Sequence, residues 1–119
     1  LIELYSRPHQ IVGMATAGIS FASVMASHLK QPFGYARSEI KPHGTGKILE
    51  GNINKGLPIV LIEDVVSTGG SLIKAIHALR EQGYIVNQAI SVVDRGMGGS
   101  EALKAIGVDL KSLMSMNDV

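Results

Sequence analysis

Residues 59–62, Ile-Val-Leu-Ile, form a run in which every side chain is apolar. A strand with one face in water alternates apolar and polar residues, whereas a strand covered on both faces needs no polar positions. The run therefore predicts a buried strand of a parallel sheet. Two acidic residues, a stretch rich in hydroxyl groups and glycine, and a helical pattern follow it directly.

The rest of the chain alternates between short apolar runs and longer segments with helical spacing. The short runs predict strands over 11–14, 33–36, 89–93 and, last in the chain, 109–115. The predicted helices are 18–30, 71–82 and 100–106, with Gly83 and Gly107 placed to end the second and third. This order is typical of an α/β fold with a mostly parallel sheet, and right-handed crossovers would place its flanking helices on both faces.

Composition limits the class of protein. The chain has 119 residues, and we interpret 1–119 as a single domain. A net charge of +1 gives no broad attraction to nucleic acid or membranes, and the lack of cysteine excludes a disulfide scaffold. The apolar runs are too short to span a bilayer, and because no charged segment followed by a long apolar run opens the sequence, we expect no secretory signal. We therefore expect a cytoplasmic protein with no nucleic-acid or membrane partner.

The interval 38–54 fits neither pattern. It contains Gly44, Gly46 and Gly51, charges of both signs and one proline, and it predicts a long mobile loop or a flexible hairpin. Long loops inside compact domains are usually either functional or disordered.

The segment 63–71 carries the chemistry that the residues themselves suggest. Ligands of open α/β sheets bind beyond the carboxyl ends of the strands, and a helix N-terminus preceded by glycines favours a phosphate. Ser67, Thr68 and Ser71 add hydroxyl donors, while Glu63 and Asp64 can accept from a vicinal diol or hold a hydrated Mg²⁺. A phosphate and a diol at this spacing describe a ribose 5-phosphate.

An ordinary turn between a strand and a helix accounts for each feature of this segment taken alone, but it fits the whole ordered segment poorly. Two common phosphate motifs fit the chain less well still. A P-loop ending at Lys47 would need Gly at 41 and Ser or Thr at 48, where the chain has Lys41 and Ile48. No dinucleotide fingerprint follows a strand.

The segment 59–71 resembles the phosphoribosyl pyrophosphate (PRPP) signature of type I phosphoribosyltransferases. The segment 35–46, with Lys41, His43, Gly44 and Gly46, resembles the mobile catalytic loop of the orotate phosphoribosyltransferase family. The segment 13–19 resembles the pyrophosphate-binding turn of that family, and Asp94-Arg95 stands where it carries an orotate-binding arginine. The resemblance extends over 10–113.

This resemblance implies an activity and its partners. The implied reaction is transfer of ribose 5-phosphate from PRPP to orotate, giving orotidine 5′-monophosphate and pyrophosphate in de novo UMP synthesis. It implies Mg²⁺ held mainly by PRPP and water near Glu63 and Asp64, without a direct cluster of protein ligands. It also implies a homodimer in which loop 38–47 acts in the neighbouring subunit's site.

The resemblance assigns roles to individual residues. It assigns catalytic roles to Lys41, His43 and Asp64, and it implies orotate binding by Ser67 and Arg95. The residues implied to bind PRPP are Thr16, Ala17, Arg37, Lys41, His43, Glu63, Asp64, Val65, Val66, Ser67, Thr68, Gly69, Gly70 and Ser71.

The chain also departs from the family pattern. Ala17 and Ser38 stand where some relatives have lysine, which leaves fewer fixed charges for pyrophosphate. Family members are longer, and the N-terminal segment that forms a hood over the base has no counterpart, so we expect the core portion of a longer chain. Two alternatives share the fold: a purine phosphoribosyltransferase, and a PRPP-binding regulatory module without turnover.

Overall fold

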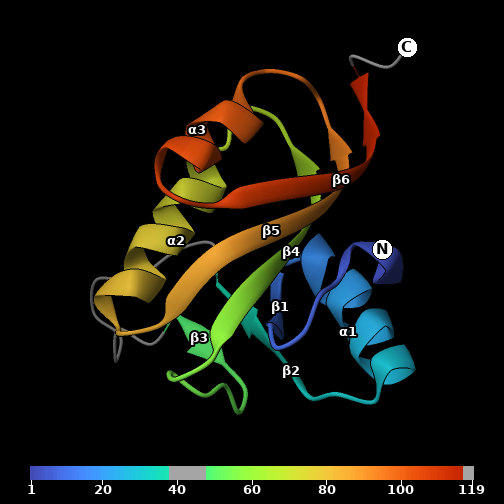
Figure 1. The fold of residues 1–119 in the computed structure, drawn as a ribbon, viewed down its shortest axis with the longest axis vertical. Helices are drawn as coiled ribbons and strands as arrows, with labels where there is room; N and C mark the ends of the chain where they lie inside the picture. The colour runs from blue at the N-terminus through green and yellow to red at the C-terminus, as the bar shows by residue number, and fades with distance from the viewer. Residues whose placement is uncertain (38–47, 117–119) are drawn as a thin grey trace.

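The computed structural model describes residues 1–37 and 48–116. In these ranges six strands form one sheet of order β3-β2-β1-β4-β5-β6, in which β3 is antiparallel to β2 and the other neighbours are parallel (Figure 1). The elements are η1 (Ile2–Leu4), β1 (Gln10–Met14), α1 (Ala17–Leu29), β2 (Phe33–Ala36), β3 (Leu49–Glu50), β4 (Pro58–Val66), α2 (Gly70–Glu81), β5 (Ile85–Asp94), α3 (Gly99–Ala105) and β6 (Asp109–Ser115).

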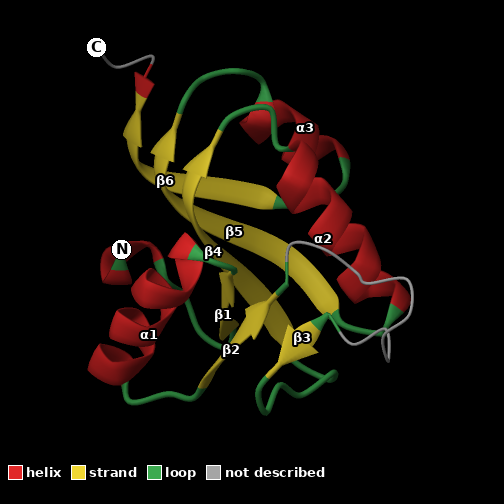
Figure 2. Ribbon diagram, turned by 180° about the vertical axis from the view of Figure 1, so that it is seen from behind, coloured by secondary structure: helices red, strands yellow, loops and turns green. Residues whose placement is uncertain are grey.

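Helices cover both faces of the sheet. Helix α1 lies on one face, and α2 and α3 lie on the other (Figures 1 and 2). Val60 and Ile62 of β4 pack in a cluster with Met25 of α1. Ile59 and Leu61 pack in a second cluster with residues of α2 and α3. Alternate residues of β4 thus enter two separate apolar layers, which explains why the run 59–62 has no polar position and confirms the predicted α/β architecture.

Differences from the predicted elements have local causes. Strand β4 continues to Val66, so the two acidic residues lie within the strand rather than after it. Strand β5 begins at Ile85, four residues before the predicted start of the strand. Polar Gln88 pairs with Val60 of β4, and Asn87 lies at a register shift between the two strands, so the strand extends through polar residues that the apolar pattern leaves out. Strand β3, in the predicted loop 38–54, has only two residues and therefore no detectable period. Residues 38–47 lie outside the described ranges.

The strand order places a switch point between β1 and β4. From β1 the chain crosses to β2, and from β4 it crosses to β5 in the opposite direction, so the two crossovers diverge. Ligands of such sheets bind beyond the carboxyl ends of the strands at this point. Within the described ranges, no helix has the length and apolar character needed to cross a membrane.

Two glycines allow α1 to approach the switch point closely. A Cβ atom on Gly18 would collide with the carbonyl oxygen of Ile62 in β4. A Cβ atom on Gly13 would lie 2.6 Å from the carbonyl oxygen of Gly18 and 2.9 Å from Cβ of Ala22. The start of α1 is therefore held directly against β1 and β4.

We predict that Gly18→Ala destabilises the fold by about 1–3 kcal/mol, because the added methyl group meets backbone that cannot move without disturbing β4. Urea unfolding followed by circular dichroism measures the change. Ser20→Ala, at an exposed position in the same helix, is the control and should change the free energy of unfolding by less than about 0.5 kcal/mol. Equal stability of the two variants would contradict the close contact.

Candidate functional site

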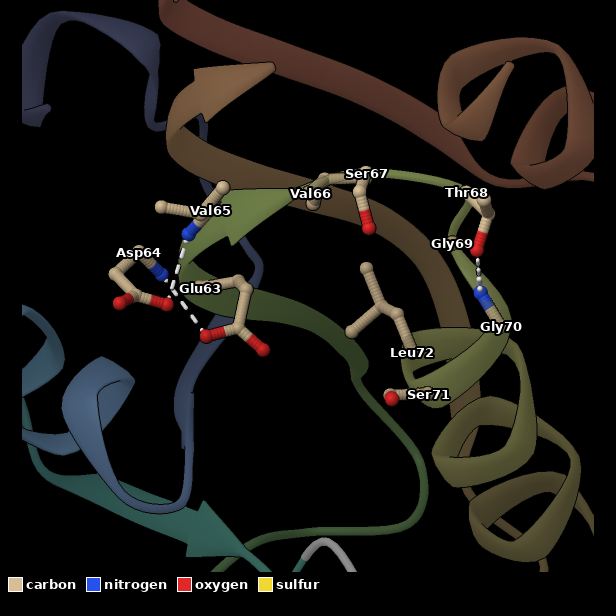
Figure 3. A pocket seen from close by; sticks show the side chains of 10 residues that line it. All are labelled: Glu63, Asp64, Val65, Val66, Ser67, Thr68, Gly69, Gly70, Ser71 and Leu72. Atoms are coloured by element: carbon tan, nitrogen blue, oxygen red, sulfur yellow. Dashed lines mark hydrogen bonds between the residues drawn. The ribbon is translucent and has the colours of Figure 1, made fainter. Parts of the chain in front are cut away.

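One continuous segment forms a pocket at the carboxyl end of β4. Its lining runs from the last residues of the strand through the connecting loop into the first turn of α2 (Figure 3). The side chains of Glu63, Ser67 and Ser71 point into the space between β4 and α2, and the side chain of Leu72 lies between Ser67 and Ser71. The lining residues are Glu63, Asp64, Val65, Val66, Ser67, Thr68, Gly69, Gly70, Ser71 and Leu72.

The two acidic residues of the pocket differ in their charge state. Burial raises the pKa of Glu63 to about 7, and hydrogen bonding with the side chain of Asp64 adds to the increase. Hydrogen bonding with the Glu63 side chain lowers the pKa of Asp64. The Asp64 amide also donates to Oε1 of Glu63 at 2.9 Å, and the Val65 amide donates to Oδ1 of Asp64 at 2.8 Å. Near neutral pH, Asp64 is therefore an anion while Glu63 is divided between its acid and carboxylate forms.

The loop after β4 presents the N-terminus of α2 to the pocket. Gly69 is the N-cap and has φ 86°, a left-handed conformation that glycine adopts without a steric penalty. The Gly69 carbonyl accepts from the amide of Ile73 at 2.8 Å, and the Gly70 amide lies 3.5 Å from Oγ1 of Thr68. Amide groups in the first turn of a helix, together with the helix dipole, favour an anion such as phosphate.

The turn after β1 lies beside this pocket. Thr16 is the N-cap of α1, and both Thr16 and Ala17 are exposed. The close approach of Gly18 to Ile62 places the turn against β4 just before Glu63. A second helix N-terminus thus begins at the same edge of the sheet.

Arg37 follows β2 at that edge but makes a different contact. Its Nη2 atom donates to Oε1 of Glu50 in β3 at 3.0 Å, and both side chains are partly exposed. Arg37 lies outside the set of described residues that line the pocket. The predicted catalytic residues Lys41 and His43 lie outside the described ranges.

Arg95 joins the rim of the pocket through its backbone. Its amide donates to the carbonyl of Val66 at 2.9 Å, directly after the last register pair of β4 and β5. The residue is exposed, and the described pocket lining does not include its side chain. The carboxylate of Asp94 accepts from the amide of Gly96 at 2.9 Å.

Two residues of this region were not predicted as part of the site. Leu72 lines the pocket and is also part of the buried core, and an apolar residue in a predicted helix by itself indicates only the core role. Gly99 donates its amide to the carbonyl of Ser67 at 3.1 Å. The pair Gly98-Gly99 before the predicted third helix is the signal that was available, but nothing local connects it to Ser67.

Within residues 1–37 and 48–116, no group of three or more His, Cys, Asp and Glu side chains is arranged to hold a metal ion. The acidic groups that the pocket offers are Glu63 and Asp64. Mg²⁺ commonly binds through one or two carboxylates together with water and substrate phosphates. The pair therefore has the oxygen donors and the charge that such a partly hydrated ion needs.

Comparison with known proteins identifies relatives that match most of this chain. The orotate phosphoribosyltransferase of Sulfolobus acidocaldarius is 38% identical over 92% of this chain, which spans 55% of the relative's own length. The crystal structure of orotate phosphoribosyltransferase from Aeropyrum pernix has a TM-score of 0.76 and 36% identity, covering 92% of this chain and 60% of that one.

A third relative was solved in complex with PRPP. The structure of Mycobacterium tuberculosis orotate phosphoribosyltransferase in complex with PRPP has a TM-score of 0.74 and 25% identity, covering 95% of this chain and 66% of that one. The resemblance inferred from the sequence motifs is thus confirmed. Residues 4–106 match the phosphoribosyl transferase domain. This chain therefore belongs to the phosphoribosyl transferase domain family.

Proposed function

We propose that this chain is the catalytic core of an orotate phosphoribosyltransferase. The reaction transfers ribose 5-phosphate from PRPP to orotate and yields orotidine 5′-monophosphate and pyrophosphate, a step of UMP synthesis. The observation that carries the proposal is the pocket of residues 63–72, which joins an acidic pair to a helix N-terminus in one segment. The similarity to curated orotate phosphoribosyltransferases supports the choice of base.

The pocket binds the ribose 5-phosphate part of PRPP. The loop 68–71 binds the 5-phosphate through the amides at the start of α2 and the hydroxyls of Thr68 and Ser71. Asp64, with its lowered pKa, stays anionic and stabilises positive charge that develops on the ribose ring as the bond to pyrophosphate breaks. Glu63, with its raised pKa, can either donate to or accept from a ribose hydroxyl. Val65 and Val66, the last two residues of β4, also line the pocket and contribute to PRPP binding.

The pyrophosphate part of PRPP binds at the same edge of the sheet. It is bound by Thr16 and Ala17 at the N-terminus of α1 and by Arg37, which follows β2. To bind pyrophosphate, the Arg37 side chain must leave its ion pair with Glu50. This is feasible because an exposed ion pair contributes only about 0–1 kcal/mol to stability. Lys41 and His43 complete the charge stabilisation from loop 38–47 of the neighbouring subunit in a homodimer.

Glu63 and Asp64 would hold Mg²⁺ near the ribose, largely through water and substrate oxygens. The ion supplies positive charge that offsets the charge of the departing pyrophosphate. Orotate is bound by Ser67 and by Arg95, whose planar guanidinium group suits a carboxylate because it can form two parallel hydrogen bonds. We propose a cytoplasmic location, where PRPP and orotate would both be available.

Base specificity tests the reaction directly. The full-length protein is mixed with PRPP, Mg²⁺ and either orotate, adenine, guanine or hypoxanthine, and pyrophosphate release is measured. We expect release with orotate and at most about 1% of that rate with each purine, because the base is selected at the transition state. Preferential use of a purine supports the purine-type alternative, while PRPP binding without turnover supports a regulatory module.

We predict that Lys41→Ala retains PRPP binding but lowers kcat by about 100-fold or more, because the lysine acts on charge that appears only in the transition state. Steady-state kinetics and calorimetry with PRPP separate the two effects. Lys74→Ala, at an exposed position on α2, removes the same charge and should retain both properties. Unchanged turnover in Lys41→Ala would contradict the role given to Lys41.

Glu63 makes stability depend on pH with a defined sign. Its pKa is about 7 in the folded chain against an ordinary value of 4.5, so its contribution is complete below 4.5 and is lost as the pH rises through 7. Because the side chain is only half-buried, we expect a loss on the order of 1 kcal/mol.

Urea unfolding of the unliganded chain between pH 4.5 and 8 measures this loss. Glu63→Gln should remove that part of the pH dependence, since glutamine does not titrate. Glu81→Gln, at an exposed position near the end of α2, should keep it. The raised pKa of Glu63 would be disproved if Glu63→Gln and the unmodified chain had the same pH profile.

A further inference from the structure

The start of α3 is in direct backbone contact with the loop after β4. The Gly99 amide donates to the Ser67 carbonyl at 3.1 Å, and the Arg95 amide donates to the Val66 carbonyl at 2.9 Å. These two hydrogen bonds hold the carbonyl groups of the last residue of β4 and of the first residue after it, and both donors lie in the segment 95–99. The segment 95–99 therefore acts as a support behind the pocket, whose lining includes both carbonyl-bearing residues.

The contact leaves no room for a side chain at position 99. Gly99 is buried, and a Cβ atom there would lie 2.6 Å from the carbonyl oxygen of Ser67 and 2.6 Å from Cγ1 of Val66. It would also lie 3.4 Å from the amide nitrogen of Gly69, the N-cap of α2. From the other side, a Cβ atom on Gly69 would lie 3.3 Å from Cα of Gly99. The two glycine backbones thus pack face to face.

This packing fixes the direction of the peptide group between Ser67 and Thr68. In a trans peptide the C=O and N–H bonds point in opposite directions. Because the Ser67 carbonyl points to the Gly99 amide, the amide of Thr68 points away from α3. The hydrogen bond from Gly99 therefore orients the first amide of the loop that leads into α2.

We propose that Gly99 is a positioning residue for the phosphate-binding loop 68–71, acting through the carbonyl of Ser67 just before that loop and without touching the substrate. It keeps the loop backbone in the one conformation that aligns the amides at the start of α2. This proposal rests on the proposed function only for the identity of the ligand, PRPP. The segment 95–99 also contains Arg95, which we propose to bind the base. The same segment therefore contacts both the phosphate-binding part and the base-binding part of the site.

The neighbouring residue Gly98 provides a matched control. Gly98 has φ 92°, so alanine strains the backbone there, but no atom lies within 4 Å of its added Cβ. Gly98→Ala therefore perturbs the same segment without pushing on Ser67. Gly99→Ala adds the same methyl group directly against the loop.

The test measures PRPP binding by calorimetry with Mg²⁺ and amide hydrogen exchange of the unliganded proteins by NMR. We expect Gly99→Ala to raise the Kd for PRPP about tenfold and to speed exchange of the amides of residues 69–72, because the loop must shift to admit the methyl group. Gly98→Ala should change the Kd by less than about twofold and leave those exchange rates unchanged. Equal Kd values and equal exchange rates in both variants would overturn the proposal.

A measurement on the unmodified protein covers the case in which Gly99→Ala does not fold. Saturating PRPP should slow exchange of the Gly99 amide, because a loop held by ligand also holds its hydrogen-bond partner. An unchanged Gly99 exchange rate at saturation would overturn the proposal. Failure of the unmodified chain to bind PRPP would instead reject the proposed function, and the exchange rates of residues 69–72 in the two variants would still decide the role of Gly99.

Discussion

The burial of β4 on both faces is the constraint on which the rest of the structure depends. Residues 59–62 are completely excluded from solvent, with alternate side chains in the layer of α1 and in the layer of α2 and α3. A shift of one residue in register would exchange these two sets of side chains, so the position of the strand is strongly specified. The residues that follow Ile62 therefore emerge at a fixed point of the sheet edge, next to the start of α1.

Two acidic residues, Glu63 and Asp64, follow the buried run directly in the same strand. Glu63 is still close enough to the apolar layer for burial to raise its pKa to about 7, while Asp64 keeps a lowered pKa one residue later. Neighbouring residues of a strand point to opposite faces, so a single step along the chain changes the environment of the carboxyl group. Two chemically similar side chains thereby become suited to different hydrogen-bonding roles.

The sequence allowed prediction of those features that arise from adjacent residues. The apolar run 59–62, the acidic pair, Gly69 and Gly70 together predicted a strand, a ligand-binding loop and a helix start in this order, and the structure has these elements around a pocket. The position of strand β3 within the interval 38–54 was not predicted, because a strand of two residues shows no alternation of apolar and polar positions. The pairing of Arg37 with Glu50 and the contact of Gly99 with Ser67 also escaped prediction, because each joins residues that are distant in sequence and depends on how strands and helices are stacked.

The pocket is built from consecutive residues, and this has a consequence for how such a site can be inherited. The residues that line it come from one strand, one loop and one helical turn, so they stay together wherever that unit is carried, provided that the segment 95–99 is carried with it to hold the loop. The residues that bind the rest of a ligand can then come from other strands, and they can change without altering the pocket. Recognition of a common sugar phosphate is separable in this way from the choice of the group to which it is joined.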